Sequence, residues 1–219
     1  MFIWLPPTEA PDSRPALNKE SENQPSASDF FALPDSVASR AIRDFAGMPL
    51  RWEPLKVDFR QQTYELHCGE EILGLMHCEI NWRSCRGLAR TKEGTWSFRT
   101  RGAVAEIETD KGDRLLVRPY GNGPVLMPPF PMLCSATLSL PNGDDYFLKS
   151  WGFFTAHFRW LAADNTSLVT ASVRHRFMTP PRGGDVEVHA PAAALPELDL
   201  LITLGWYFAL APPVFGGGP

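Results

Sequence analysis

Residues 195–210, LPELDLLITLGWYFAL, decide the fold. They open with Pro196 and the acids Glu197 and Asp199, as the first turn of a helix favours, and stop just before Pro212. The helix predicted at about residues 196–211 is apolar on all sides, and a helix without a polar face is buried in protein or in lipid. A bilayer span needs about 20 apolar residues. This segment is too short, so we expect it to fill the interior of the protein.

The chain before this helix is a series of short strands separated by turns. Alternation of apolar and polar residues indicates ten strands, at 63–69, 70–78, 94–102, 102–109, 113–120, 134–140, 145–151, 153–161, 167–177 and 185–190. One buried and one solvated face is typical of antiparallel sheet, and ten to twelve such strands close most simply into a barrel. We therefore expect a mainly β fold, with a closed antiparallel barrel of about twelve strands around the buried C-terminal helix. Trp151, Trp160 and Trp206 are expected in its core.

The composition divides the chain into three parts. Residues 1–34 hold six prolines and no hydrophobic period, which predicts a disordered tail. Residues 35–49 begin with Asp, carry apolar residues at helical spacing and include the terminating Gly47, so we expect a short amphipathic helix there. The barrel domain is assigned to 35–212, and 213–219 to a flexible C-terminus.

The order of a polar Pro-rich tail, antiparallel strands and a closing hydrophobic helix resembles the tubby C-terminal superfamily, which includes phospholipid scramblases and the LURP-one-related proteins of plants. The similarity is carried by GTWSFRTRG at 94–102, DKGDRLLVRPYGNG at 110–123 and RGGDVEVHAPAAALPELDLLITLGWYFALAP at 182–212. It implies a twelve-stranded barrel around a buried helix. It also implies binding of phosphoinositides or other anionic lipids at a membrane surface.

Charge is distributed unevenly along the chain. The net charge of -4 argues against a dedicated nucleic-acid-binding protein. Residues 81–118 are locally basic, with nine Lys or Arg against five Asp or Glu. The candidate lipid-binding residues in this stretch are Arg86, Arg90, Lys92, Arg99 and Arg101. Basic residues near an anionic leaflet contribute about 1 kcal/mol each, although the same residues also fit the solvated outer side of a barrel.

The sequence contains no recognisable catalytic or metal motif. A nucleophile elbow, HExxH, a phosphate loop and a Rossmann glycine pattern are all missing, so we predict neither an enzyme nor a cofactor. Neighbouring strand residues point to opposite faces, which argues against zinc at the dipeptides 67–68 and 77–78. The four cysteines, Cys68, Cys78, Cys85 and Cys134, are expected to be structural.

The cysteine usage and the lack of a secretory signal predict a reduced, cytoplasmic protein. Peripheral association with a membrane is what the resemblance and the basic residues add to this expectation. The sequence favours a non-enzymatic binding or scaffolding module for anionic phospholipid or phosphoinositide membranes, with no nucleic-acid partner. A protein-interaction module without lipid activity is the alternative. A small-ligand-binding barrel is a third interpretation, which a helix inside the barrel would weaken.

Overall fold

The computed structural model describes residues 40–81, 84–101, 104–119, 135–151, 155–174 and 180–210. The predicted tail at 1–34 and the predicted C-terminus at 213–219 lie outside these ranges. Cys134 and the side chain of Arg101 lie outside them as well.

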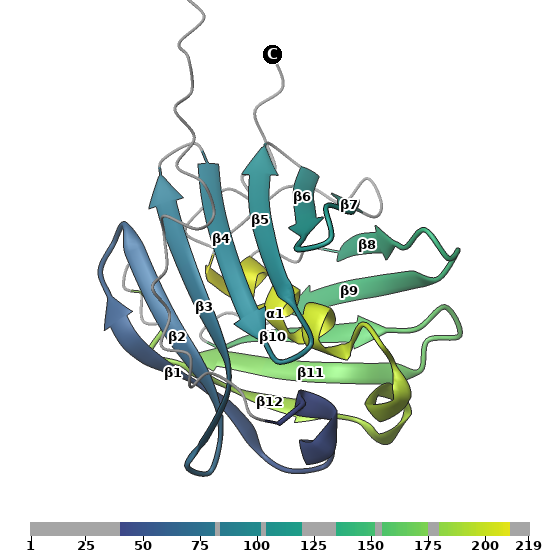
Figure 1. Cartoon of the computed structure of the whole chain (residues 1–219), viewed down its shortest axis with the longest axis horizontal. Coiled ribbons are helices and arrows are strands. Elements are labelled where there is room, and N and C mark those ends of the chain that lie inside the picture. The colour runs from purple at the N-terminus through teal and green to yellow at the C-terminus, as the bar shows by residue number, and fades with distance from the viewer. Residues whose placement is uncertain are drawn as a thin grey trace, which may run out of the picture. The chain divides into compact units, whose positions relative to one another are not determined.

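Within the described residues, twelve antiparallel strands form a closed barrel (Figure 1). The strands are β1 (Leu50–Val57), β2 (Gln61–Cys68), β3 (Glu71–Asn81), β4 (Ser84–Thr91), β5 (Thr95–Arg101), β6 (Val104–Thr109), β7 (Arg114–Pro119), β8 (Ser135–Ser139), β9 (Asp145–Trp151), β10 (Thr155–Leu161), β11 (Ser167–Arg174) and β12 (Gly184–Val188). Each strand pairs with its neighbour in sequence, and β1 pairs with β12 to close the ring. The predicted closed antiparallel barrel is therefore confirmed.

Two strands were missing from the ten recognised in the sequence. In β4 the buried positions carry small or polar residues (Cys85, Gly87, Ala89 and Thr91), so no apolar alternation is visible. In β1 only Leu50 and Trp52 are buried, and the strand is exposed from residue 53 to residue 56. Both strands lie in the wall because their neighbours pair with them, which a single-strand pattern cannot reveal.

Helix α1 (Leu198–Leu210) lies inside the barrel, shown in yellow in Figure 1. All thirteen of its residues are buried, and it contacts β3, β4 and β5 on one side and β10 and β11 on the other. This confirms the prediction of one buried C-terminal helix. None of the helices in the described ranges is long and apolar enough to cross a membrane.

Two glycines in the wall make room for consecutive aromatic rings of α1. A Cβ atom at Gly87 in β4 would lie 2.7 Å from the ring of Tyr207, and one at Gly184 in β12 would lie 2.7 Å from the ring of Trp206. Trp206 also stacks on Trp52, with ring centroids 5.4 Å apart. Because neither glycine can carry a side chain without displacing a ring, the helix has one defined position along the barrel.

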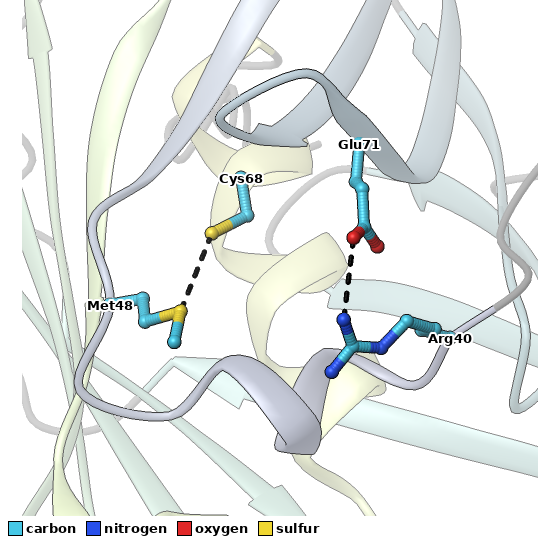
Figure 2. A network of polar contacts seen from close by, with 4 residues as sticks. All are labelled: Arg40, Met48, Cys68 and Glu71. Atoms are coloured by element: carbon cyan, nitrogen blue, oxygen red, sulfur yellow. Dashed lines mark hydrogen bonds and ion pairs between the residues drawn. The ribbon is translucent and has the colours of Figure 1, made fainter.

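Two short 3-10 helices, η2 (Ile42–Phe45) and η3 (Ala190–Ala194), also contact α1. The sequence predicted a helix over 35–49; its described part is the single turn η2, and 35–39 lie outside the described residues. Figure 2 shows two contacts between residues on either side of η2 and residues on either side of the β2–β3 turn. Arg40 pairs with Glu71 at 3.3 Å, and the Cys68 thiol lies 4.0 Å from the sulfur of Met48.

Candidate functional site: basic rows and an apolar tip on the barrel surface

The structure brings most of the predicted lipid-binding residues to one part of the outer wall. Arg86 and Arg90 of β4 and Arg99 of β5 alternate with buried neighbours and are half-buried on the outer face. Lys92 is exposed in the turn that joins these strands. Arg101 ends β5, and its side chain is not among those described. The predicted placement of Arg99 opposite the buried Trp96 and Phe98 is confirmed.

Strand pairing sets two glutamates beside these arginines. Arg86 lies directly opposite Arg99, Glu79 of β3 lies opposite Arg86, and Glu106 of β6 lies opposite Arg99. We call this line the Glu-Arg-Arg-Glu row. Like charges directly opposite each other are destabilising, and opposite charges are favourable. The row is therefore balanced in charge, which the local basic excess of 81–118 did not indicate because Glu79 lies outside that segment.

The β1–β2 hairpin ends in an apolar tip that sequence analysis missed. Leu55 is 62% exposed and Phe59 is 72% exposed, and the exposed Lys56 and Arg60 alternate with them. The tip is held in a turn by Asp58, whose carboxylate accepts hydrogen bonds from the backbone N–H groups of residues 60 and 61 at 2.7 and 2.6 Å. These bonds lower the pKa of Asp58, so its carboxylate stays ionised and is bonded to the backbone of the turn.

This apolar tip lies next to the Glu-Arg-Arg-Glu row. Gln61, the first residue of β2, pairs with Glu79 at the end of the row. The carbonyl of Arg60 accepts a hydrogen bond from the N–H of Ile80 at 2.7 Å. The only signal for the tip in the sequence is WEPLKVDFR at 52–60, where a proline and a charge interrupt any strand pattern.

Trp151 was expected in the core, and this prediction is wrong. It is 37% exposed because it occupies an outward position of β9, whereas Trp160 and Trp206 are buried as predicted. Its ring stacks on His157 of β10, with ring centroids 5.4 Å apart and an interplanar angle of 17°. The guanidinium of Arg159 lies 5.1 Å from the centre of the same indole. Trp151 is thus part of a surface cluster.

A second line of basic residues lies beside Trp151, on the opposite wall of the barrel. Arg159 lies directly opposite Lys149 of β9, and both side chains are exposed. Ser135 of β8 lies on the other side of Lys149, and Thr170 of β11 on the other side of Arg159. We call this line the Lys149–Arg159 row. Unlike the first row, it has hydroxyl residues at its ends.

Inside the barrel, the start of α1 carries a buried carboxyl group. Oδ2 of Asp199 accepts a hydrogen bond from the hydroxyl of Thr91 at 2.5 Å, while Oδ1 is buried without a partner among the described residues. The pKa of Asp199 is raised to about 6, mainly by burial and in smaller part by Glu93, while the Thr91 hydroxyl and Arg43 oppose the shift. Asp199 is 1% exposed and so belongs to the core.

The cysteines and histidines of the described chain do not assemble a metal site. Cys68, Cys78 and Cys85 are free thiols, the last two of them buried. His77 shares a hydrogen bond with Thr63 on the outer face, whereas its neighbour Cys78 points into the core. Among the described residues, no three His, Cys, Asp or Glu side chains are grouped as ligands for a metal ion.

Comparisons with protein-family models, with curated proteins and with solved structures found no match for this chain.

Proposed function

We propose that this protein is a non-enzymatic binding module that associates with anionic phospholipid or phosphoinositide membranes, and that it belongs with the tubby-like proteins it resembles. The observation that carries the membrane proposal is the β1–β2 tip, which exposes Leu55 and Phe59, each followed by an exposed basic residue, Lys56 and Arg60. Large apolar side chains at a protruding turn are unfavourable in water and favourable in the acyl boundary of a bilayer. The flanking basic groups suit anionic headgroups.

The basic residues near the tip support a membrane-bound state in which the tip faces the bilayer. Arg86 and Arg99 lie in the row that begins beside the tip, and Lys92 is exposed in the β4–β5 turn. Glu79 and Glu106 offset part of this charge, so we expect the arginines to contribute less than the roughly 1 kcal/mol that an isolated basic residue contributes near an anionic leaflet. The tip should therefore dominate affinity, and the row should add salt-sensitive attraction.

The interior supports binding on the outside of the barrel. Every residue of α1 is buried, and the rings of Trp206 and Tyr207 occupy positions where Gly184 and Gly87 leave space. The lumen is filled by the protein's own side chains, which disfavours the alternative of a small-ligand-binding barrel.

Vesicle co-sedimentation tests this proposal. Neutral vesicles are compared with vesicles that contain phosphatidylserine or a phosphoinositide, each at low and high salt. We expect binding to anionic vesicles only, weakened by salt, and reduced at least about ten-fold in the double variant Leu55→Asp/Phe59→Asp, because charged groups resist entry into the bilayer. Arg86→Glu/Arg99→Glu should give a smaller loss that disappears at high salt.

Leu116→Ser is the control for an exposed apolar side chain, because Leu116 is exposed on the outer wall in β7, away from the tip. A neutral substitution is used because Leu116 lies opposite Glu106 of the Glu-Arg-Arg-Glu row. This variant should bind vesicles as the unsubstituted protein does. Absence of binding to every vesicle type would overturn the proposal, and so would equal loss in the control and the tip variants.

A further inference from the structure

The Lys149–Arg159 row has the properties of an anion site. Lys149 and Arg159 are directly opposite each other in a β9–β10 pair, and both are exposed. Cross-strand partners have Cβ atoms about 5 Å apart, so the two positive side chains repel each other when the site is empty. Among the described residues, neither forms an ion pair with an acidic group.

The surroundings of this row differ from those of the Glu-Arg-Arg-Glu row. Its ends are Ser135 and Thr170 in place of glutamates, and the Thr170 hydroxyl shares a hydrogen bond with His189 at 2.9 Å. The nearest acid in register is Glu187, one strand beyond Thr170, and its carboxylate lies 3.7 Å from the ring of His189. The positive charge of Lys149 and Arg159 is therefore left uncompensated.

The aromatic neighbours hold one of the two cations in place. Trp151 stacks on His157, and the Arg159 guanidinium lies 5.1 Å from the centre of the indole. A cation over an aromatic face is attracted by the negative face of the ring. Because Arg159 is already positioned, less side-chain entropy is lost when it binds an anion.

We propose that the Lys149–Arg159 row binds a phosphate group carried by a soluble ligand. A phosphate dianion matches the charge of the two cations, and its tetrahedral oxygens can accept hydrogen bonds from a guanidinium fork and an ammonium group together. The Ser135 hydroxyl lies next to Lys149 as a further donor. A single carboxylate offers half the charge and fewer acceptor directions, so it fits the row less well.

The position of the row favours a soluble ligand over a lipid headgroup. β9 and β10 are separated from β4 and β5 by at least three strands in either direction around the ring, and α1 lies between the two walls. A protein that faces a membrane with the β4–β5 wall would therefore hold the Lys149–Arg159 row on the opposite wall, away from that membrane. The phosphate proposal itself does not depend on membrane binding, because it rests on the charges of the row alone.

Calorimetry and thermal unfolding with inorganic phosphate and pyrophosphate, against acetate at equal ionic strength, test the proposal. We expect phosphate and pyrophosphate to raise the melting temperature and acetate not to. Lys149→Ser and Arg159→Gln should each weaken pyrophosphate binding about ten-fold, the loss expected for one charge-assisted hydrogen bond. Arg114→Ser, at an exposed position of β7, is the control and should bind as the unsubstituted protein does.

Equal stabilisation by acetate, or unchanged binding in Lys149→Ser and Arg159→Gln, would overturn the proposal. Vesicle binding provides a separate result. If Lys149→Ser loses binding to phosphoinositide vesicles but leaves the response to free pyrophosphate unchanged, the row binds a headgroup and the soluble-ligand assignment is wrong. Failure of the membrane proposal alone leaves the pyrophosphate result unaffected.

Discussion

The two walls that enclose α1 differ on both of their faces. The β3–β6 wall holds the helix with hydrogen bonds, from Thr91 to Asp199 and between Tyr207 and both Thr100 and the Cys85 carbonyl. On its outer face, two opposed arginines have a glutamate in register on either side. The β8–β11 wall approaches the helix with Trp160, which lies beside Gly205, and its outer face carries two bases opposite each other.

The β3–β6 wall therefore positions the helix, whereas the outer face of the β8–β11 wall is suited to bind a ligand. Directional bonds from the β3–β6 wall fix where α1 lies along the barrel, because hydrogen bonds depend on geometry more than apolar contacts do. On the β8–β11 wall, Trp160 lies beside Gly205 of the helix, where a Cβ atom would be 3.1 Å from the indole nitrogen. Its outer face tolerates the repulsion of Lys149 and Arg159, which is a cost in the absence of a ligand.

The largest expected effect is at the glycine of the β3–β6 wall. Gly87→Val should destabilise the protein by about 3 kcal/mol or more, because the new side chain would overlap the Tyr207 ring. Chemical denaturation measures this loss. In the double variant Gly87→Val/Tyr207→Leu the loss should be smaller than the sum of the two single losses, since the ring has been removed. Additive losses would show that Tyr207 is not seated against β4.

The next effect concerns pH and the same wall. Asp199 titrates near pH 6 in the folded protein and near pH 4 when unfolded, so the folded state binds more protons between these values. Stability should therefore fall as pH rises from about 4 to about 6, by up to about 3 kcal/mol. Asp199→Asn should flatten this part of the curve and raise stability at pH 7. A curve of unchanged slope in the variant would contradict the assignment.

A smaller effect is expected when two tyrosines are replaced by phenylalanine. One, in α1, is bonded to the β3–β6 wall, and the other is in the β8–β11 wall. Tyr207→Phe removes hydrogen bonds of 2.7 Å to Thr100 and 2.8 Å to the Cys85 carbonyl and should cost about 1–3 kcal/mol. Tyr146→Phe, on β9, removes one longer bond of 3.3 Å to Glu197 and should cost less. Equal losses in urea denaturation would remove the contrast between the two walls.

The smallest expected effect distinguishes the two rows by its sign. Glu79→Ser leaves Arg86 opposed only by the like charge of Arg99 and should destabilise by about 0.2–1 kcal/mol. Lys149→Ser relieves repulsion with Arg159 and should stabilise by a similar amount. Both differences should shrink in about 0.5 M salt, where charges on the surface are screened. The same sign for both variants would show that the register does not govern their energetics.

Much of the fold could be predicted from the sequence because each signal is local. The alternation in β10 and β11 and the apolar run of α1 each state how one element is buried, without reference to other strands. β4 was missed because Gly87 and Ala89 are small for a reason that lies in α1. A strand whose inner face is shaped by a helix over 100 residues away carries no apolar period of its own.

The candidate sites could be predicted only in part for the same reason. A count of charges along the chain found Arg86 and Arg99, but only the pairing of strands shows that glutamates are opposite them. Lys149 and Arg159 are ten residues apart and were not recognised as neighbours. Trp151 was assigned to the core by residue type, although its parity in β9 places it outside.

The location of α1 at the end of the described chain also has a consequence for biosynthesis. All twelve strands leave the ribosome before the helix that fills their interior, and β1 must wait for β12 before the ring can close through Leu50–Trp52 and Gly184–Val186. Until then the inward faces of the strands have nothing to cover them. The barrel should therefore close only after β12 and α1 have been synthesised, and the exposed inward faces should make the chain prone to aggregation until then.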